Sequence, residues 1–243
     1  GEHMKIQSTR DIHTGKLKVF VYGFSGAGKT TLAKTLPKCL VISAESGLLS
    51  LAGTGVDYVD ISQDDAGNVI PKEKRIDRLA EVYKWLLTDE AKKYEWVMLD
   101  SITEVGQCLV DRMKREYPDR KDTLPLWGEY AQKMRDLVKS FRDLPCHNVV
   151  VISLAVIDKD ENGKRFAAVD LQGSISQKLA GFFDWFLFLS ATKQDDGSVK
   201  RELICQPEDW VLVKDRSGLL AAREPADLGE LARKLKGSEW TTN

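Results

Sequence analysis

The sequence predicts an α/β fold with a mostly parallel central sheet, helices on both faces and antiparallel strands at one edge. Two observations predict it. Short apolar runs, of the kind buried on both faces in a parallel sheet, alternate with amphipathic helical segments. A glycine-rich loop comes directly after the first of these runs and before a helical segment. The later strands are expected to join the sheet as antiparallel additions.

The composition is that of one folded domain. With 243 residues, 42% of them hydrophobic, the chain has enough apolar material for a real core. The net charge of −1 excludes a global basic field but leaves room for a local basic patch. No apolar run approaches the roughly 18–20 residues of a membrane span, so no membrane association is expected. Cys39, Cys108, Cys146 and Cys205 form no CxxC pair and are interpreted as thiols in a reducing cytosol.

The elements of the first half follow from residue type and periodicity, once residues 1–4 (GEHM) are set aside as a cloning scar. Residues 17–22 (LKVFVY) are rich in β-branched and aromatic side chains and predict a strand. Pro37 ends the helix predicted over 29–36. The apolar positions within 75–88 fall at helical spacing and predict an amphipathic helix. Further predictions are strands over 39–44, 56–61 and 96–99, a polar loop over 62–74 and a helix over 103–115.

The second half begins with a helix predicted over 130–141 and a central strand over 148–154 (NVVVISL). Two polar segments predict loops: 116–126, which holds two prolines, and 157–172, which holds the turn signal Asn162-Gly163. The remaining predictions are a short helix over 174–182, strands over 184–189, 200–205 and 210–213, and a terminal amphipathic helix over 226–236.

The glycine-rich segment GFSGAGKT fits the phosphate-binding pattern G-x-x-x-x-G-K-[ST] in full and has the strand before it and the helix after it that the pattern requires. Its glycines let backbone N–H groups turn inward and cradle phosphates. Lys29 can reach the β- and γ-phosphates, and the Thr30 hydroxyl can ligate Mg²⁺. The predicted nucleotide contacts are Gly23, Ser25, Gly26, Ala27, Gly28, Lys29, Thr30 and Thr31.

Two carboxylates follow strands that should lie beside this loop. Asp100 ends the strand over 96–99, where it can hold the Mg²⁺ shell, although an Asp before a helix is also an ordinary cap. Ser101 stands where many ATPases carry a catalytic Glu. Glu45 is therefore the candidate that orients water against the γ-phosphate, and Glu104, one turn into the next helix, is the weaker alternative.

The order of GFSGAGKTT, CLVISAESGL, YEWVMLDSITE and NVVVISL resembles the RecA-type ATPase core. It is most similar to the small phage RecA-like proteins that carry only that core, several of which are single-strand annealing recombinases. The resemblance covers residues 17–220 and implies ATP and Mg²⁺ as cofactors, Glu45 as the water-activating residue and, for a phage protein, the cytoplasm of a bacterial host. We accordingly divide the chain into a core over 5–224 and a C-terminal helix and tail over 225–243.

The resemblance also implies two DNA-binding loops. The first corresponds to 113–126 and the second to 157–172. Basic side chains there could neutralise backbone phosphates, and Phe166 could stack on a base. Both segments also contain acidic residues, so ordinary solvated loops are the alternative interpretation. The predicted DNA contacts are Lys114, Arg115, Arg120 and Lys121 in the first loop and Lys164, Arg165 and Phe166 in the second.

A last pair of cations concerns assembly. Lys214 and Arg216 lie in VKDRSG, which resembles a signature of RadA-type proteins whose cationic residues reach the nucleotide of a neighbouring subunit. Such an arginine finger stabilises charge developing on the transferred phosphoryl group. The resemblance thus implies catalytic roles for both residues in a homo-oligomer, either a ring or a filament. The alternative is a surface turn with two solvated cations.

One departure from the RecA pattern leaves two functions open. Ser153 and Leu154 stand where RecA-like recombinases place a polar residue, usually Gln, that senses the γ-phosphate. The first hypothesis is an ATP-hydrolysing recombination protein that binds single-stranded DNA and promotes strand annealing, with a single-strand binding protein as a further partner. The second is a nucleotide-gated adaptor or loader switch that acts on a protein partner without binding DNA.

Overall fold

The computed structural model describes residues 4–6, 8, 15–121, 124–173 and 175–236. The predicted cloning scar, apart from Met4, and residues 237–243 of the predicted tail lie outside this part of the chain. The strands are β1 (Lys18–Gly23), β2 (Cys39–Ser43), β3 (Asp57–Asp60), β4 (Trp96–Asp100), β5 (Asn148–Lys159), β6 (Arg165–Val169), β7 (Trp185–Lys193), β8 (Val199–Ile204), β9 (Lys214–Asp215) and β10 (Arg223–Pro225). The α-helices are α1 (Arg75–Leu86), α2 (Ile102–Glu116), α3 (Leu124–Arg142), α4 (Ile175–Lys178) and α5 (Leu228–Lys236), and the 3₁₀-helices are η2 (Thr30–Thr35), η3 (Leu48–Leu51), η4 (Lys72–Lys74), η5 (Asp89–Lys93) and η6 (Leu179–Phe182).

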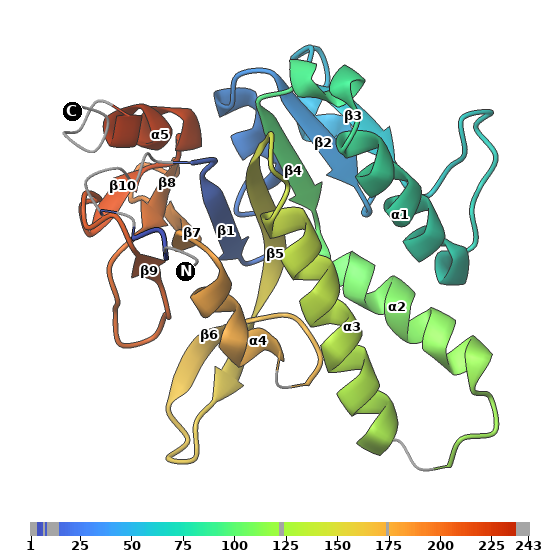
Figure 1. Cartoon of the computed structure of the whole chain (residues 1–243). Coiled ribbons are helices and arrows are strands. Elements are labelled where there is room, and N and C mark those ends of the chain that lie inside the picture. Colours follow the sequence, from blue (N-terminus) through green and yellow to red (C-terminus); the bar gives the residue numbers. More distant parts are fainter. Residues whose placement is uncertain (1–3, 7, 9–14, 122–123, 174, 237–243) are drawn as a thin grey trace.

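One sheet runs through the whole molecule in the order β10-β8-β7-β1-β5-β4-β2-β3 (Figure 1). From β7 to β3 all neighbours are parallel. At the other edge β8 pairs antiparallel with β7, and β10 pairs antiparallel with β8. The predicted α/β class, with a mostly parallel sheet and antiparallel strands at one edge, is confirmed.

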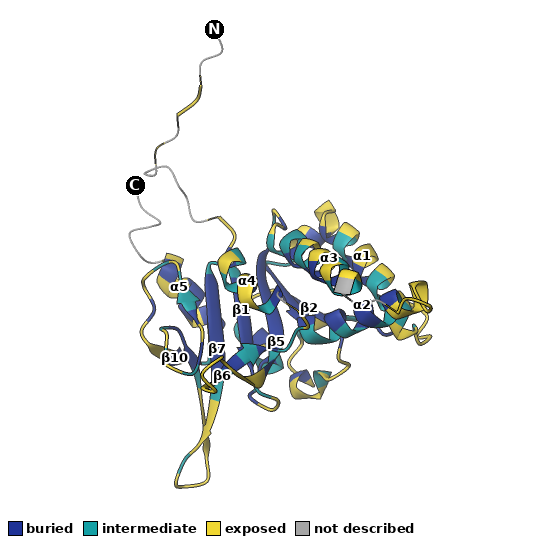
Figure 2. Cartoon of the chain, turned by 90° about the horizontal axis from the view of Figure 1, so that it is seen from below, coloured by how far each residue is buried: buried dark blue, intermediate teal, exposed yellow. Residues whose placement is uncertain are grey.

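Successive residues of each central strand enter two different cores, one on each face of the sheet. In β1, Phe20 and Tyr22 belong to the core covered by α1, α2 and α3. Val19 and Val21 belong to the second core, which α5 and η2 cover with apolar residues such as Leu231. Figure 2 shows the central strands as a buried layer in dark blue. Burial on both faces explains why these strands are continuous apolar runs.

The parallel arrangement brings the ends of four strands to one edge of the sheet. Gly23, at the end of β1, is in register with Leu154 of β5, and Asp100, at the end of β4, is in register with Ser43 of β2. The loops after β1, β2 and β4 therefore leave the sheet side by side. This edge is where ligands bind in open α/β sheets.

The segment after the glycine loop differs from the predicted α-helix over 29–36. It is the 3₁₀-helix η2, in which the N–H of Leu36 donates to the carbonyl of Ala33 at 3.1 Å. Pro37 has no N–H to extend an α-helical ladder, and the residue before a proline is pushed into extended backbone, as Leu36 is.

Three further predictions are corrected. The predicted loop over 157–172 is largely a β-hairpin, because β5 continues to Lys159 and β6 returns antiparallel to it. Residues 210–213 form no strand; Val211 makes only isolated bridges, and the short strand β9 follows instead. The predicted loop over 116–126 is shorter than expected, since α3 begins at Leu124, where Pro125 suits the first turn of a helix. The helix predicted from residue 174 begins outside the described residues and is described from Ile175.

No helix in the part of the chain that the structure describes is long and apolar enough to cross a membrane.

Candidate functional site

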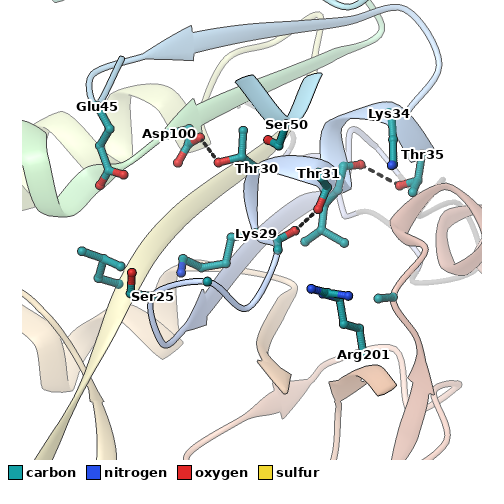
Figure 3. A pocket seen from close by; sticks show the side chains of 15 residues that line it. Ser25, Lys29, Thr30, Thr31, Lys34, Thr35, Glu45, Ser50, Asp100 and Arg201 are labelled. Atoms are coloured by element: carbon teal, nitrogen blue, oxygen red, sulfur yellow. Dashed lines mark hydrogen bonds between the residues drawn. The ribbon is translucent and has the colours of Figure 1, made fainter. Parts of the chain in front are cut away.

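The glycine loop lines a hollow of about 610 Å³ at the carboxyl edge of the sheet (Figure 3). Gly26 and Gly28 have φ values of 79° and 97°, which residues with a Cβ rarely adopt. The N–H of Ala27 donates to the carbonyl of Phe24 at 3.1 Å and closes the turn. Of the predicted nucleotide contacts, Ser25, Gly26, Gly28, Lys29, Thr30 and Thr31 line the hollow; Gly23 and Ala27 are buried behind it.

Lys29 and Asp100 are two buried groups of opposite charge in this hollow, with exposed fractions of 8% and 5%. Burial lowers the pKa of Lys29, and the nearby Glu45 and Asp100 oppose that shift. Burial raises the pKa of Asp100, while the hydrogen bond from Thr30 opposes it. Charges in such a poorly solvated place act strongly on a phosphate or a cation beside them.

Thr30 and Asp100 supply oxygen ligands that fit Mg²⁺. The Thr30 hydroxyl donates to Oδ2 of Asp100 at 2.6 Å, so the two predicted metal ligands lie together. The buried hydroxyl of Ser43, whose residue is in register with Asp100, has no hydrogen-bond partner among the described residues. Mg²⁺ prefers oxygen ligands and is often held by one carboxylate together with nucleotide phosphates. The donor set therefore fits Mg²⁺.

Glu45 follows β2 and lies across the hollow from Lys29 (Figure 3). The hydroxyl of Ser101 donates a hydrogen bond to Oε1 of Glu45. The same hydroxyl accepts from the N–H of Glu104 at 3.3 Å and so caps α2. Glu104 itself turns away and pairs with Lys72 at 2.9 Å. The geometry thus favours Glu45 over Glu104 as the carboxylate beside the phosphates, and it assigns Ser101 a role that the sequence did not reveal.

Leu154 also lines the hollow, at the end of the parallel part of β5. The departure noted in the sequence therefore falls at a position that borders the hollow. The backbone N–H of Leu154 is not free to bind a ligand, because it donates to the hydroxyl of Thr103 at 3.0 Å.

Arg201 is a site residue that sequence reasoning missed. It belongs to the antiparallel strand β8, yet its Nε donates to the carbonyl of Ala27 in the glycine loop at 3.1 Å. The hollow also includes Lys34, Thr35, Ser50 and Ala226. Lys34 and Thr35 belong to η2, directly after the loop, but stand outside the motif. No motif marks Arg201, Ser50 or Ala226, because these residues reach the loop only through the folding of the chain.

Arg216 lies far from the glycine loop of its own chain, whereas Lys214 is opposite Phe186 and so stands level with the middle of β1. The N–H of Arg216 donates to the carbonyl of Asp184 at 3.0 Å, and the N–H of Lys18 donates to Oδ2 of the same Asp184 at 2.9 Å. Arg216 therefore lies beside the start of β1, whereas the loop follows its end. At about 3.3 Å per residue, β1 separates the two by roughly 17 Å. Neither cation lines the hollow of its own subunit.

The predicted contacts of the first DNA loop lie at the end of α2 and beyond it. Lys114 and Lys121 are exposed. Arg115 pairs with Glu73. Arg120 approaches Glu129 at 3.8 Å and lies over the ring of Tyr117, 5.0 Å from its centroid. Two of the four cations are thus engaged with carboxylates of their own chain.

The predicted contacts of the second DNA loop lie on the β5–β6 hairpin. Lys164 lies 4.0 Å from the carboxylate of Asp209, and Arg165 is exposed. Phe166 is half-buried and stands opposite Asp158 in the ladder. In Figure 1 the hairpin protrudes at the lower left and the end of α2 at the lower right, both at the end where the parallel strands finish. These DNA contacts stay predictions.

Comparison with known proteins agrees with this site. The sequence profile of a protein family described as the AAA domain matches residues 15–217. No curated protein matches the chain. Among solved structures, a KaiC-like protein from the hyperthermophilic archaeon Pyrococcus horikoshii OT3 is 14% identical, with 78% of this chain and 79% of that chain covered and a TM-score of 0.44. An ATPase from the type III secretion system of pathogenic bacteria is 15% identical, with 72% of this chain and 51% of that chain covered and a TM-score of 0.45. The family match covers most of the chain and agrees with the predicted P-loop ATPase class. The narrower assignments to the RecA type and to the phage type stay predictions.

Proposed function

Because the chain belongs to the AAA domain family, we propose that it is an ATPase of RecA type that hydrolyses ATP with Mg²⁺, binds single-stranded DNA and promotes strand annealing. The observation that carries the DNA proposal is the course of β5. This strand borders the nucleotide hollow at Leu154 and continues without a break into the hairpin that bears Lys159, Lys164 and Arg165. One continuous strand thus connects the nucleotide hollow with a protruding hairpin that bears three cations together with three acidic residues.

The residues of the hollow divide the ATPase chemistry among them. The loop amides and Lys29 bind the phosphates. Thr30 and Asp100 would hold Mg²⁺, which would supply positive charge to neutralise the phosphates. Glu45, held by the Ser101 hydroxyl, orients a water molecule toward the γ-phosphate and accepts its proton. Its exposed position after β2 leaves room for that water.

A second surface feature supports contact with unpaired bases. Beside the first predicted DNA loop lies a hollow of about 190 Å³ lined by the exposed Tyr117 and the half-buried Trp127, with the buried Tyr130 beneath them. Lys114 and Arg120 stand at its border. Proteins that bind single strands without sequence preference combine aromatic stacking surfaces with cations that follow the backbone.

The site is proposed to be completed by a neighbouring subunit. Arg216 lies at the opposite end of β1 from the loop of its own chain, and neither Lys214 nor Arg216 lines the hollow, so both are proposed to meet a phosphate across a subunit interface. The side chain of Arg216 is held by the carbonyl of Gly181 at 2.5 Å and by Asp184 at 3.9 Å. These contacts hold the guanidinium at the surface of its own subunit, and to act as an arginine finger it would exchange them for a phosphate of the neighbour.

The second candidate, a nucleotide-gated adaptor or loader switch, is favoured by Leu154. An apolar side chain at this place forms no hydrogen bond to a γ-phosphate, so it cannot report the nucleotide state to the hairpin as a Gln would. A switch that changes its assembly with ATP, and acts on a protein partner, does not need a side chain that transmits the nucleotide state to the hairpin.

The two candidates are separated by filter binding and annealing of complementary oligonucleotides, with ATP·Mg²⁺ present or absent. The proposed function expects single-strand binding and faster annealing in the wild-type protein. Lys29→Ala is expected to abolish ATP turnover, and Glu45→Gln to stop hydrolysis while ATP still binds. Lys38→Ala is the matched control, because Lys38 is an exposed cation that pairs with Glu95 outside the hollow. If no single-strand binding occurs under either condition, the DNA proposal is wrong; if ATP then changes the mass measured by light scattering, the adaptor is supported.

A further inference from the structure

The nucleotide hollow has a part that phosphate chemistry does not use. On the side of Lys29 the hollow contains Glu45 and Asp100, where the β- and γ-phosphates belong. On the other side it continues past Thr31 to Thr35, Arg201 and Ala226. Figure 3 shows the side chains of Lys29 and Arg201 on opposite sides of the loop. A nucleotide whose terminal phosphates lie beside Lys29 must direct its nucleoside toward this second part.

Arg201 is held at the border of that part by the glycine loop itself. Its Nε donates to the carbonyl of Ala27 at 3.1 Å, and a Cβ placed on Gly28 would lie 3.0 Å from the same Nε. The positive φ of Gly28 and the absence of its side chain thus let the guanidinium lie directly against the loop. One edge of the guanidinium is occupied by this hydrogen bond, and its flat face remains available.

The charges around Arg201 differ from those of its neighbours. Lys200 and Arg223 both pair with Glu202, at 3.0 Å and 3.2 Å. Side chains alternate along a strand, so Arg201 points away from Glu202 toward the hollow. No carboxylate of the described residues lies within ion-pair distance of Arg201. A cation held in place without an acidic partner, at the border of a hollow, is arranged for a ligand rather than for a salt bridge.

We propose that Arg201 holds the nucleoside half of the bound nucleotide, with its guanidinium face stacked on the base. This inference rests on the proposed nucleotide binding. It gives Arg201 the role of favouring a nucleotide over a polyphosphate that has no nucleoside. Guanidinium groups stack on aromatic faces, and a partly desolvated contact of this kind changes affinity by roughly tenfold. Thr35 and Ala226, which line the same part of the hollow, provide the facing walls.

The test is isothermal titration of the full chain with ATP·Mg²⁺ and, separately, with inorganic tripolyphosphate·Mg²⁺, which has the phosphates but no nucleoside. Arg201→Ala is expected to weaken ATP binding about tenfold and to leave tripolyphosphate binding within about twofold of wild type. Lys200→Ala, which removes the same charge one residue away, is expected to change neither affinity. Arg201→Lys keeps the charge and a donor for the Ala27 carbonyl but lacks the planar face; it is expected to lose ATP affinity severalfold.

The opposite results are equally definite. If Arg201→Ala weakens both ligands to the same extent, Arg201 serves the phosphates or the loop, and the nucleoside assignment is wrong. The assignment also fails if ATP affinity is unchanged in both Arg201→Ala and Arg201→Lys. If Arg201→Ala does not fold, the lysine variant alone decides. A wild-type protein that binds neither ligand would overturn the proposed nucleotide binding itself, which is a different failure.

Discussion

Gly229, near the start of α5, is the point where the C-terminal helix meets the segment that follows the glycine loop. A Cβ placed on Gly229 would lie 2.0 Å from the carbonyl oxygen of Thr35 in η2. Ordinary van der Waals contact begins at 3.4 Å, so Gly229→Ala forces α5 and η2 apart by about 1.4 Å. Both segments carry buried side chains of the same core, such as Leu228 and Leu32. Overpacking of this kind costs about 1–3 kcal/mol, a large part of the roughly 5–15 kcal/mol that stabilises a domain.

The expected result is a free energy of unfolding lower by about 1–3 kcal/mol, measured by urea denaturation followed by tryptophan fluorescence. ATP affinity should fall as well, because Thr35 and Ala226 line the nucleotide hollow. The matched control is Gly128→Ala in α3, where a Cβ meets no atom within 4 Å. That change removes a helical glycine without a clash and should raise stability by about 0.5–1 kcal/mol. If Gly229→Ala is as stable as Gly128→Ala, the close packing of α5 against η2 is refuted.

Two further predictions concern the chemistry of the site and the pH dependence of stability. Ser101→Ala removes the donor that holds Glu45, so the kcat of ATP hydrolysis should fall about tenfold at nearly unchanged KM. Ser101→Thr keeps the hydroxyl and should retain most of the activity. Equal kcat values in the two variants would contradict this role of Ser101. Burial lowers the pKa of Lys18 from 10.5 to about 8, so the unfolded chain binds more protons between these two values. The free energy of unfolding of the wild type, relative to that of Lys18→Met, should therefore rise with pH across this window, and a flat difference from pH 7 to 10.5 would show that Lys18 titrates normally.

The parallel half of the fold and the phosphate loop could be predicted from the sequence because their signals are local. A strand buried on both faces is an apolar run, and the loop motif needs only eight consecutive residues. The positions of the turn after β2 and of the end of β4, both beside the loop, could also be predicted, because neighbouring parallel strands end at the same edge of the sheet. Glu45, Asp100 and Lys29 were placed together correctly for this reason.

The β5–β6 hairpin escaped prediction because its signals are mixed. Lys159, Asp160, Glu161 and Lys164 make the segment look like a solvated loop. Its pairing depends on the alternating burial of residues 165–169, of which only two, Ala167 and Val169, are fully buried. A strand that projects beyond the sheet buries few side chains, so its sequence lacks the apolar pattern by which strands are recognised. The position of Arg201 escaped for another reason: 174 residues separate it from Ala27, and only the folded sheet brings the two together.

The end of β5 also bears on how the nucleotide and the hairpin are connected. The apolar Leu154 removes a side-chain sensor, but its backbone is not isolated. Its N–H donates to the hydroxyl of Thr103 at 3.0 Å, and the same hydroxyl lies 3.1 Å from that of Ser153. Thr103 is in the first turn of α2, two residues after Ser101, which holds Glu45. A hydrogen-bonded connection therefore runs from Glu45 through the start of α2 to the strand that becomes the hairpin. Because this route uses backbone and hydroxyl groups, the missing polar residue at position 154 does not by itself separate the ATPase site from the proposed DNA surface.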